Sequence, residues 1–272
     1  MDPRTEGVTQ PSGYMPIAAE AMDLATEIVR QRAPAVVKAK GDRDMVSDVD
    51  IEIERAVRGY LRSRSPEIGF LGEEEGNAPS DSELQWVLDP IDGTANFVKG
   101  VPLYSISLAL INDKEPVLGV IDVPAEGCRY SAAVGSGAYC GDRRIRVRAS
   151  SHLKEAIVTV GDYAVGERAQ AKNRTRLGVT TQLAEQAQRV RMLGSAAIDL
   201  AWLANGRTDA AIIFGNKPWD TAAGVVLVRE AGGLVVDADG KQHTTRSAST
   251  IAASAELLSE LLDLIPARGL AV

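Results

Sequence analysis

The chain has 272 residues, of which 45% are hydrophobic, 25% charged and only 4% aromatic, and its net charge is −7 with a pI near 5.1. This composition is that of a globular protein with an aliphatic core, and the acidic balance argues against a nucleic-acid partner. No apolar run approaches the roughly 18 residues that a membrane helix needs. Because the N-terminal segment lacks the basic flank and apolar stretch of a signal peptide, we expect a cytoplasmic protein without a membrane partner.

Two long helices and two short strands are expected before residue 91. Residues 14–33 place apolar side chains at the spacing of one helical face, and residues 44–66 do so again. Ser47 or Asp48 is a suitable N-cap for the second helix, and Pro66 would stop it. Two apolar runs bounded by turn residues, 68–72 and 85–90, indicate strands.

The pattern changes in the middle of the chain. Residues 103–148 form short strand-like runs separated by Asn-Asp, Pro and Gly signals, which is typical of a meandering antiparallel sheet. Beyond Ser150 strands and helices alternate, with Gly206 and Gly232 where helix C-caps belong. The expected strands are 156–161, 189–193, 208–214, 234–237 and 250–254, and the expected helices are 167–188, 195–206, 219–233 and 255–265.

These patterns predict the α/β class, with a chain in three parts. Residues 1–14 form a short disordered lead, 15–150 an α+β portion with the antiparallel sheet, and 151–272 an α/β portion. We expect the last two portions to form one compact catalytic unit.

The cysteines and histidines offer little chemistry. Cys128 and Cys140 lack metal-ligand spacing, and we predict that both are reduced structural residues. His152 and His243 are the two histidines, and both stand in polar segments that indicate surface loops. A histidine-based triad or a histidine-bound zinc is therefore not expected, and carboxylates are left as the reactive groups.

The hexapeptide 89–94 combines groups that bind cations with groups that bind anions. An apolar run delivers Asp89 to the end of a strand, and Asp92 follows on the next turn. Gly93 and Thr94 open a short helix whose first N–H groups could hold a phosphate. Carboxylates beside such amides suit Mg²⁺-assisted phosphoryl chemistry, although Asp-Pro and Asp-Gly are also common in ordinary turns.

Other acidic residues have simple structural alternatives when each is considered alone. The run Glu73-Glu74-Glu75 is typical of a solvated surface, with Glu75 expected to point to solvent. Asp220 would serve as a helix N-cap, and Asp50 as an acid on a helix surface.

Together these acids form a pattern with four blocks in a fixed order. The blocks are Asp50, then Gly72-Glu73-Glu74, then residues 89–94, then Trp219-Asp220-Thr221-Ala222. This order resembles the inositol monophosphatase family of the lithium-sensitive, magnesium-dependent phosphatases, over roughly residues 15 to 265. The resemblance implies a layered α/β/α/β/α sandwich of the inositol monophosphatase and fructose-1,6-bisphosphatase type, and a homodimer.

The resemblance also implies a role for each matching residue. The expected metal ligands are the carboxylates of Glu73, Asp89, Asp92 and Asp220 and the main-chain carbonyl of Ile91. The expected catalytic residues are Asp50, Glu73 and Thr94, with Thr94 bonded to Asp50 and orienting the attacking water. The expected substrate-binding residues are Asp92, Gly93, Thr94, Gly194, Ser195, Ala196 and Lys217, of which Gly194-Ser195-Ala196 would otherwise be a helix start and Lys217 a surface lysine.

The implied cofactors are two or three Mg²⁺ ions, with Mn²⁺ as a substitute and Ca²⁺ and Li⁺ as inhibitors. The implied substrate is a small phosphorylated metabolite. Ile213 stands where inositol-selective members carry an acid, so histidinol phosphate and sugar phosphates remain alternatives. A bisphosphate nucleotidase would need more basic residues than Lys217 supplies, and a catalytically idle, metal-binding homologue is the non-enzyme alternative.

Overall fold

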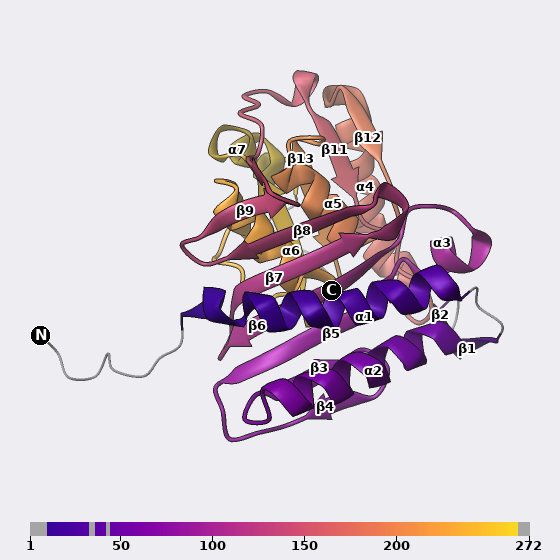
Figure 1. Cartoon of the computed structure of the whole chain (residues 1–272). Helices are drawn as coiled ribbons and strands as arrows, with labels where there is room; N and C mark the ends of the chain where they lie inside the picture. The colour runs from indigo at the N-terminus through magenta and orange to yellow at the C-terminus, as the bar shows by residue number, and fades with distance from the viewer. Residues whose placement is uncertain (1–9, 33–35, 42–43, 266–272) are drawn as a thin grey trace, which may run out of the picture.

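The computed structural model describes residues 10–32, 36–41 and 44–265, and its elements follow the predicted order (Figure 1). The predicted lead lies mainly outside this part of the chain. Its last residues, Pro11–Tyr14, form a 3-10 helix that leads directly into α1 (Met15–Gln31).

The larger sheet has eight strands and carries the acidic hexapeptide. All neighbouring strands are antiparallel except β3 and β5, which are parallel. In spatial order the strands are β10 (Arg143–Ile145), β9 (Gly137–Cys140), β8 (Cys128–Ala133), β7 (Glu115–Val123), β6 (Ser105–Asn112), β5 (Leu84–Asp92), β3 (Gly69–Gly72) and β4 (Gly76–Ala78). The meander predicted for residues 103–148 is confirmed by the run from β6 to β10.

A smaller, mixed sheet is built from the C-terminal portion. Its strands are, in spatial order, β12 (Arg189–Arg191), β11 (Ile157–Val160), β13 (Ala210–Phe214), β15 (Ser249–Ala253) and β14 (Leu234–Val236). A separate antiparallel hairpin of β1 (Val37–Gly41) and β2 (Asp44–Ser47), which the sequence analysis did not predict, precedes α2.

The helices and sheets alternate in five layers. α1 and α2 cover one face of the large sheet, α5 and α6 lie between the two sheets, and α4 and α7 cover the outer face of the small sheet. The remaining helix bounds are α2 (Asp48–Arg64), α3 (Thr94–Lys99), α4 (Ala169–Gln186), α5 (Ala196–Ala204), α6 (Pro218–Glu230) and α7 (Ala255–Asp263), with 3-10 turns at Pro124–Glu126 and Leu153–Glu155. The predicted α/β/α/β/α sandwich is confirmed.

No helix in the described part of the chain is long and apolar enough to cross a membrane.

The division of the chain near residue 150 stays a prediction. Helices α5 and α6 pack against strands from both sides of residue 150, so the two portions share one core. Helix α6 approaches β7 so closely that a Cβ on Gly119 would lie 2.4 Å from the carbonyl oxygen of Ala223. This contact is backbone against backbone, and it fixes how near the helix can lie to the sheet.

The prediction of two reduced cysteines is wrong. Cys128 begins β8 and Cys140 ends β9, and the two form a disulfide with a Cα–Cα distance of 6.4 Å. The eleven intervening residues make a hairpin that folds back and brings the sulfur atoms together. The spacing of the two cysteines in the sequence therefore matches the length of this hairpin.

The prediction of a surface His243 is also wrong, whereas His152 is exposed as expected and lies 3.0 Å from Glu260. His243 is 1% exposed and its Nε2 lies 2.9 Å from the Thr250 hydroxyl. Burial, with a smaller effect from Arg229, lowers the pKa of His243 to about 4. The imidazole is therefore held neutral inside the fold.

This burial makes His243 a source of acid sensitivity. Because its pKa is lower in the folded protein than in the unfolded chain, unfolding takes up a proton as the pH falls below about 6.5. We expect His243 to cost up to roughly 3 kcal/mol of stability between pH 7 and pH 4. Urea unfolding at both pH values should show that His243→Gln loses less unfolding free energy between pH 7 and pH 4 than the wild type does. An equal loss in the two proteins would contradict the buried neutral histidine.

The close contact of α6 with β7 predicts a strong effect of one methyl group. Gly119→Ala should destabilise the protein by about 1–3 kcal/mol because neither backbone can move aside. Gly59→Ala in α2 is the matched control, since its added Cβ would meet no atom within 4 Å. The control should be neutral or stabilising in the same thermal or urea unfolding measurement. Equal behaviour of the two variants would disprove the contact.

Candidate active site

A bulge at the end of β5 brings two carboxylates together. Asp89 lies opposite Ser107 of β6, and Asp92 lies opposite Ser105, so three steps along β5 match two along β6. Residues three apart in a regular strand face opposite sides, and the extra residue of a bulge allows both to face the same side. Pro90 fits this position because it has no N–H to contribute to the ladder.

The parallel pairing of β3 with β5 adds the Glu run to the same edge. Gly72 ends β3 opposite Leu88, so Glu73 follows the end of β3 beside Asp89 of β5. The Glu73 N–H donates to the Leu88 carbonyl at 3.3 Å, which ties the two strand ends together. The carboxyl ends of parallel strands are where ligands gather in α/β proteins.

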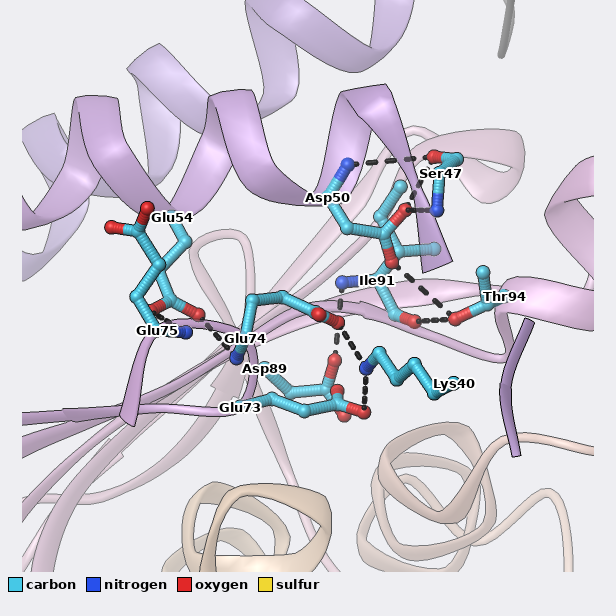
Figure 2. A network of polar contacts seen from close by, with 10 residues as sticks. All are labelled: Lys40, Ser47, Asp50, Glu54, Glu73, Glu74, Glu75, Asp89, Ile91 and Thr94. Carbon is cyan, nitrogen blue, oxygen red and sulfur yellow. Dashed lines mark hydrogen bonds and ion pairs between the residues drawn. The ribbon is translucent and has the colours of Figure 1, made fainter. Parts of the chain in front are cut away.

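A buried glutamate on α2 holds the Glu run from behind. Glu54 is 0% exposed, and its carboxylate accepts the main-chain N–H groups of Glu74 at 2.8 Å and Glu75 at 2.9 Å (Figure 2). Arg58 pairs with the same carboxylate at 2.8 Å. Gly72 leaves room for it, since a Cβ there would lie 2.2 Å from the carboxyl carbon. The turn that presents Glu73 is thus built on Glu54.

A lysine contacts the Glu run from the front. The Lys40 ammonium lies 2.9 Å from Glu73 Oε1 and also bonds to Glu74 Oε1 (Figure 2). Partial burial alone would lower the pKa of Lys40, yet its bonds to the two carboxylates raise it above its usual value. Lys40 is therefore positively charged at neutral pH, and it lies at the rim of the acidic cluster.

Asp50 caps α2 and faces Thr94. Its carboxylate accepts the Ser47 N–H at 3.0 Å and bonds to the Ser47 hydroxyl, which completes a capping box. The Thr94 hydroxyl lies 3.0 Å from the Ile91 carbonyl and 3.4 Å from Asp50 Oδ1. One hydroxyl proton serves one acceptor well, so the shorter contact to Ile91 is the stronger bond here.

Asp92 is held by the beginning of α5. Its Oδ2 accepts the Ser195 hydroxyl at 2.5 Å and the Ala197 N–H at 2.7 Å. A carboxylate is favoured at a helix N-terminus, where free N–H groups point outward. Gly93 and Gly194 both have positive φ and lie so close that a Cβ on Gly93 would be 3.0 Å from the Gly194 carbonyl. The predicted segment 194–196 therefore adjoins the hexapeptide.

Asp220 reaches the cluster from the first turn of α6. Its carboxylate accepts the Lys217 N–H at 2.6 Å, and burial raises its pKa to about 7, with further contributions from Asp92 and Glu73. Lys217 itself is exposed at the helix start. Ile213 is buried within β13, against Gly161.

The carboxylates of this cluster disfavour their own charge. Burial, followed by the charges of Glu73, Asp92 and Asp220, raises the pKa of Asp89 well above its usual value. Burial also raises the pKa of Asp92 to about 6 and that of Glu74 to about 7. A nearby cation would favour the ionised form of these groups, and an all-oxygen donor set is what Mg²⁺ prefers.

The donor set fits a magnesium site, but its side chains do not surround one closed position. In the described ranges, no three Asp, Glu, His or Cys side chains are already grouped so that they could hold one ion. Asp92, Asp220 and Glu73 instead make hydrogen bonds to Ser195, Lys217 and Lys40.

Most of the predicted site residues come together at this edge, and their roles stay proposals. The structure gathers Asp50, Glu73, Asp89, Ile91, Asp92, Gly93, Thr94, Gly194, Ser195, Ala196 and Asp220 around the end of β5. Glu75 turns away to pair with Arg55 at the surface. Two contributors were missed, Glu54 and Lys40. A glutamate next to the apolar Ile53 on a helix face was the signal for the first. For the second, the alternation of Val37-Lys38-Ala39-Lys40 marked a strand, but nothing marked the contact of Lys40 with the Glu run.

Comparisons with known proteins agree on one family. The model of the inositol monophosphatase family matches residues 12–267. The inositol-1-monophosphatase ImpA of Mycolicibacterium smegmatis is 39% identical over 254 residues, covering 93% of this chain and 91% of that protein. A protein of Thermotoga maritima named fructose-1,6-bisphosphatase/inositol-1-monophosphatase is 34% identical, covering 86% and 87%. The crystal structure of the extragenic suppressor protein suhB of Bartonella henselae matches with a TM-score of 0.86 at 32% identity, covering 93% and 98%.

The hydrogen bonds from the Glu run to Glu54 predict that a substitution of nearly equal size at this position still lowers the stability of the protein. Glu54→Gln keeps the shape but turns an NH₂ group toward one of the two N–H donors, which should cost about 1–3 kcal/mol in unfolding free energy. Glu52→Gln, two residues earlier on a more exposed side of α2, should cost little. Urea unfolding checks both variants, and equal small losses would contradict the buried clamp.

Proposed function

This chain belongs to the inositol monophosphatase family, and we propose that it is a magnesium-dependent phosphatase acting on a small-molecule phosphate monoester. Members of the family are generally metal-dependent, and relatives 37–39% identical to this chain are named inositol-1-monophosphatases. The chain is accordingly a phosphoric monoester hydrolase. The observation that supports metal use most directly is the buried carboxylate cluster with raised pKa values.

We assign the ligand roles to the residues at the end of β5. Glu73, Asp89, Asp92 and Asp220 would bind two or three Mg²⁺ ions through carboxylate oxygens, and Ile91 through its carbonyl. Bound divalent ions would acidify the attacking water and neutralise charge on the phosphoryl group and the leaving oxygen.

The remaining site residues would hold the substrate and orient the attacking water. The N–H groups of Gly93 and Thr94 would receive phosphate oxygens, and Thr94 with Asp50 would orient the water and accept its proton. Segment 194–196 would line the substrate pocket, since Ser195 fixes the Asp92 carboxylate there. Lys217 lies at the exposed rim, where it would meet a second anionic group of a substrate.

The substrate within the monoester class is a finer proposal. Ile213 presents no carboxylate to a polyol, so histidinol phosphate and sugar phosphates compete with inositol phosphate as candidates. The Thermotoga maritima relative is named for both fructose-1,6-bisphosphate and inositol-1-phosphate hydrolysis. Bisphosphate nucleotidase activity ranks lower, because Lys217 is the one basic residue in 213–218.

Other features of the family stay predictions for this chain. They are inhibition by Li⁺ and Ca²⁺, replacement of Mg²⁺ by Mn²⁺, a homodimer and a cytoplasmic location.

The proposed function predicts that activity depends on Asp89 and on magnesium. Phosphate release with Mg²⁺ should be measured with inositol 1-phosphate, histidinol phosphate, fructose 1,6-bisphosphate and adenosine 3′,5′-bisphosphate. We expect one substrate to lead and Asp89→Asn to reduce kcat about 100-fold or more, because a central ligand is lost. Removal of Mg²⁺ with a chelator should have the same effect.

Glu75→Gln is the control, because Glu75 is a carboxylate of the same run that pairs with Arg55 outside the cluster. It should retain wild-type activity. Full activity of Asp89→Asn would contradict the proposed site. Release from no substrate, with metal binding intact, would favour the catalytically idle homologue.

A further inference from the structure

Lys40 stands on an element that is lightly attached to the rest of the fold. It belongs to the β1–β2 hairpin, which pairs with neither large nor small sheet. Its side chain is 24% exposed and extends toward the Glu run, as Figure 2 shows. The ammonium therefore reaches the acidic cluster from outside it.

The contacts of this ammonium are with the carboxylates of Glu73 and Glu74. Lys40 Nζ lies 2.9 Å from Glu73 Oε1 and bonds to Glu74 Oε1. Among the ion pairs within the described part of the chain, those of Glu73 and Glu74 are both made with Lys40, while Arg55 pairs with Glu75 and Arg58 with Glu54. Within the residues that the structure describes, Lys40 thus supplies the positive charge at Glu73.

A divalent cation would need the same oxygen atoms. Glu73 is one of the proposed ligands, and its Oε1 is already occupied by the ammonium. Two cations at one carboxylate repel each other, and lysine is a compact charge on a flexible stem that can move away. The donors to Asp92 are the Ser195 hydroxyl and the Ala197 N–H. Both are neutral, so they would not repel a bound cation as the Lys40 ammonium would.

We propose that Lys40 is a tethered counter-ion that occupies Glu73 and Glu74 in the metal-free protein and must leave Glu73 when a divalent cation binds. This inference rests on the proposed metal-dependent function. It assigns Lys40 two opposite effects, stabilisation of the metal-free fold and weakening of the metal affinity.

Equilibrium binding of Mn²⁺ to the metal-free protein, without substrate, tests this competition. Lys40→Met keeps the apolar stem and removes the charge, so it should bind Mn²⁺ roughly 3- to 10-fold more tightly. Without metal, the same variant should have a lower melting temperature, because Glu73 and Glu74 then repel each other without a counter-ion. Added metal should raise its melting temperature more than that of the wild type, because the cation removes this repulsion.

Two further variants separate charge from shape. Lys40→Arg retains a cation and should bind Mn²⁺ much as the wild type does. Lys38→Met, on the same strand and exposed, should change neither affinity nor melting temperature. An equal effect of Lys38→Met would mean that the general field of the hairpin, and not the bond to Glu73, governs affinity, and this would overturn the inference.

The outcomes distinguish this inference from the proposed function. If the wild type binds Mn²⁺ and Lys40→Met, shown to be folded by circular dichroism, binds it equally or more weakly, the counter-ion role is wrong and the metal site stands. If neither protein binds metal, both proposals are wrong. Binding by Lys40→Met alone would support the inference in its strongest form.

Discussion

Repulsion among buried carboxylates is the constraint on which this structure depends. Asp89 is buried, Asp92 and Asp220 are partly buried beside it, and the nearby acids raise the cost of ionising one another. A fold that brings such groups together must have stabilising interactions elsewhere. Here they are the apolar clusters on both faces of the large sheet and the helix beginnings that supply N–H groups to individual oxygens.

The acids come from elements that are remote in sequence but rigid in place. β5 provides two through its bulge, β3 provides Glu73 through parallel pairing, and α6 provides Asp220 in its first turn. Behind them, Glu54 accepts main-chain N–H groups of the Glu run, and Ser195 donates to Asp92. The supporting hydrogen bonds thus decide where the acids lie, while the acids decide what can bind.

Local patterns in the sequence were sufficient for most of the fold and for the acids themselves. The apolar run that ends at Asp89 predicted a strand end, and helical periodicity predicted α1, α2 and α7 within a few residues. Features that depend on tertiary contacts were missed. His243 stands in a polar run but is buried beside Thr250 and Arg229, and the two cysteines meet because of a hairpin. Lys40 lies in the run Val37-Lys38-Ala39-Lys40, whose short alternation of apolar and charged residues indicates a strand. Its partners on the Glu run depend on a tertiary contact, so they could not be inferred.

The contact of Gly119 with Ala223 also has a consequence for distances across the cluster. Ala223 lies one helical turn beyond Asp220, and the helix touches β7 there through main-chain atoms. Flexible side chains, which could absorb a displacement, are absent from this point of contact. Helix α6 therefore works as a rigid spacer, and a disturbance at the middle of β7 would be transmitted along the helix to the separation between Asp220 and the acids of β5.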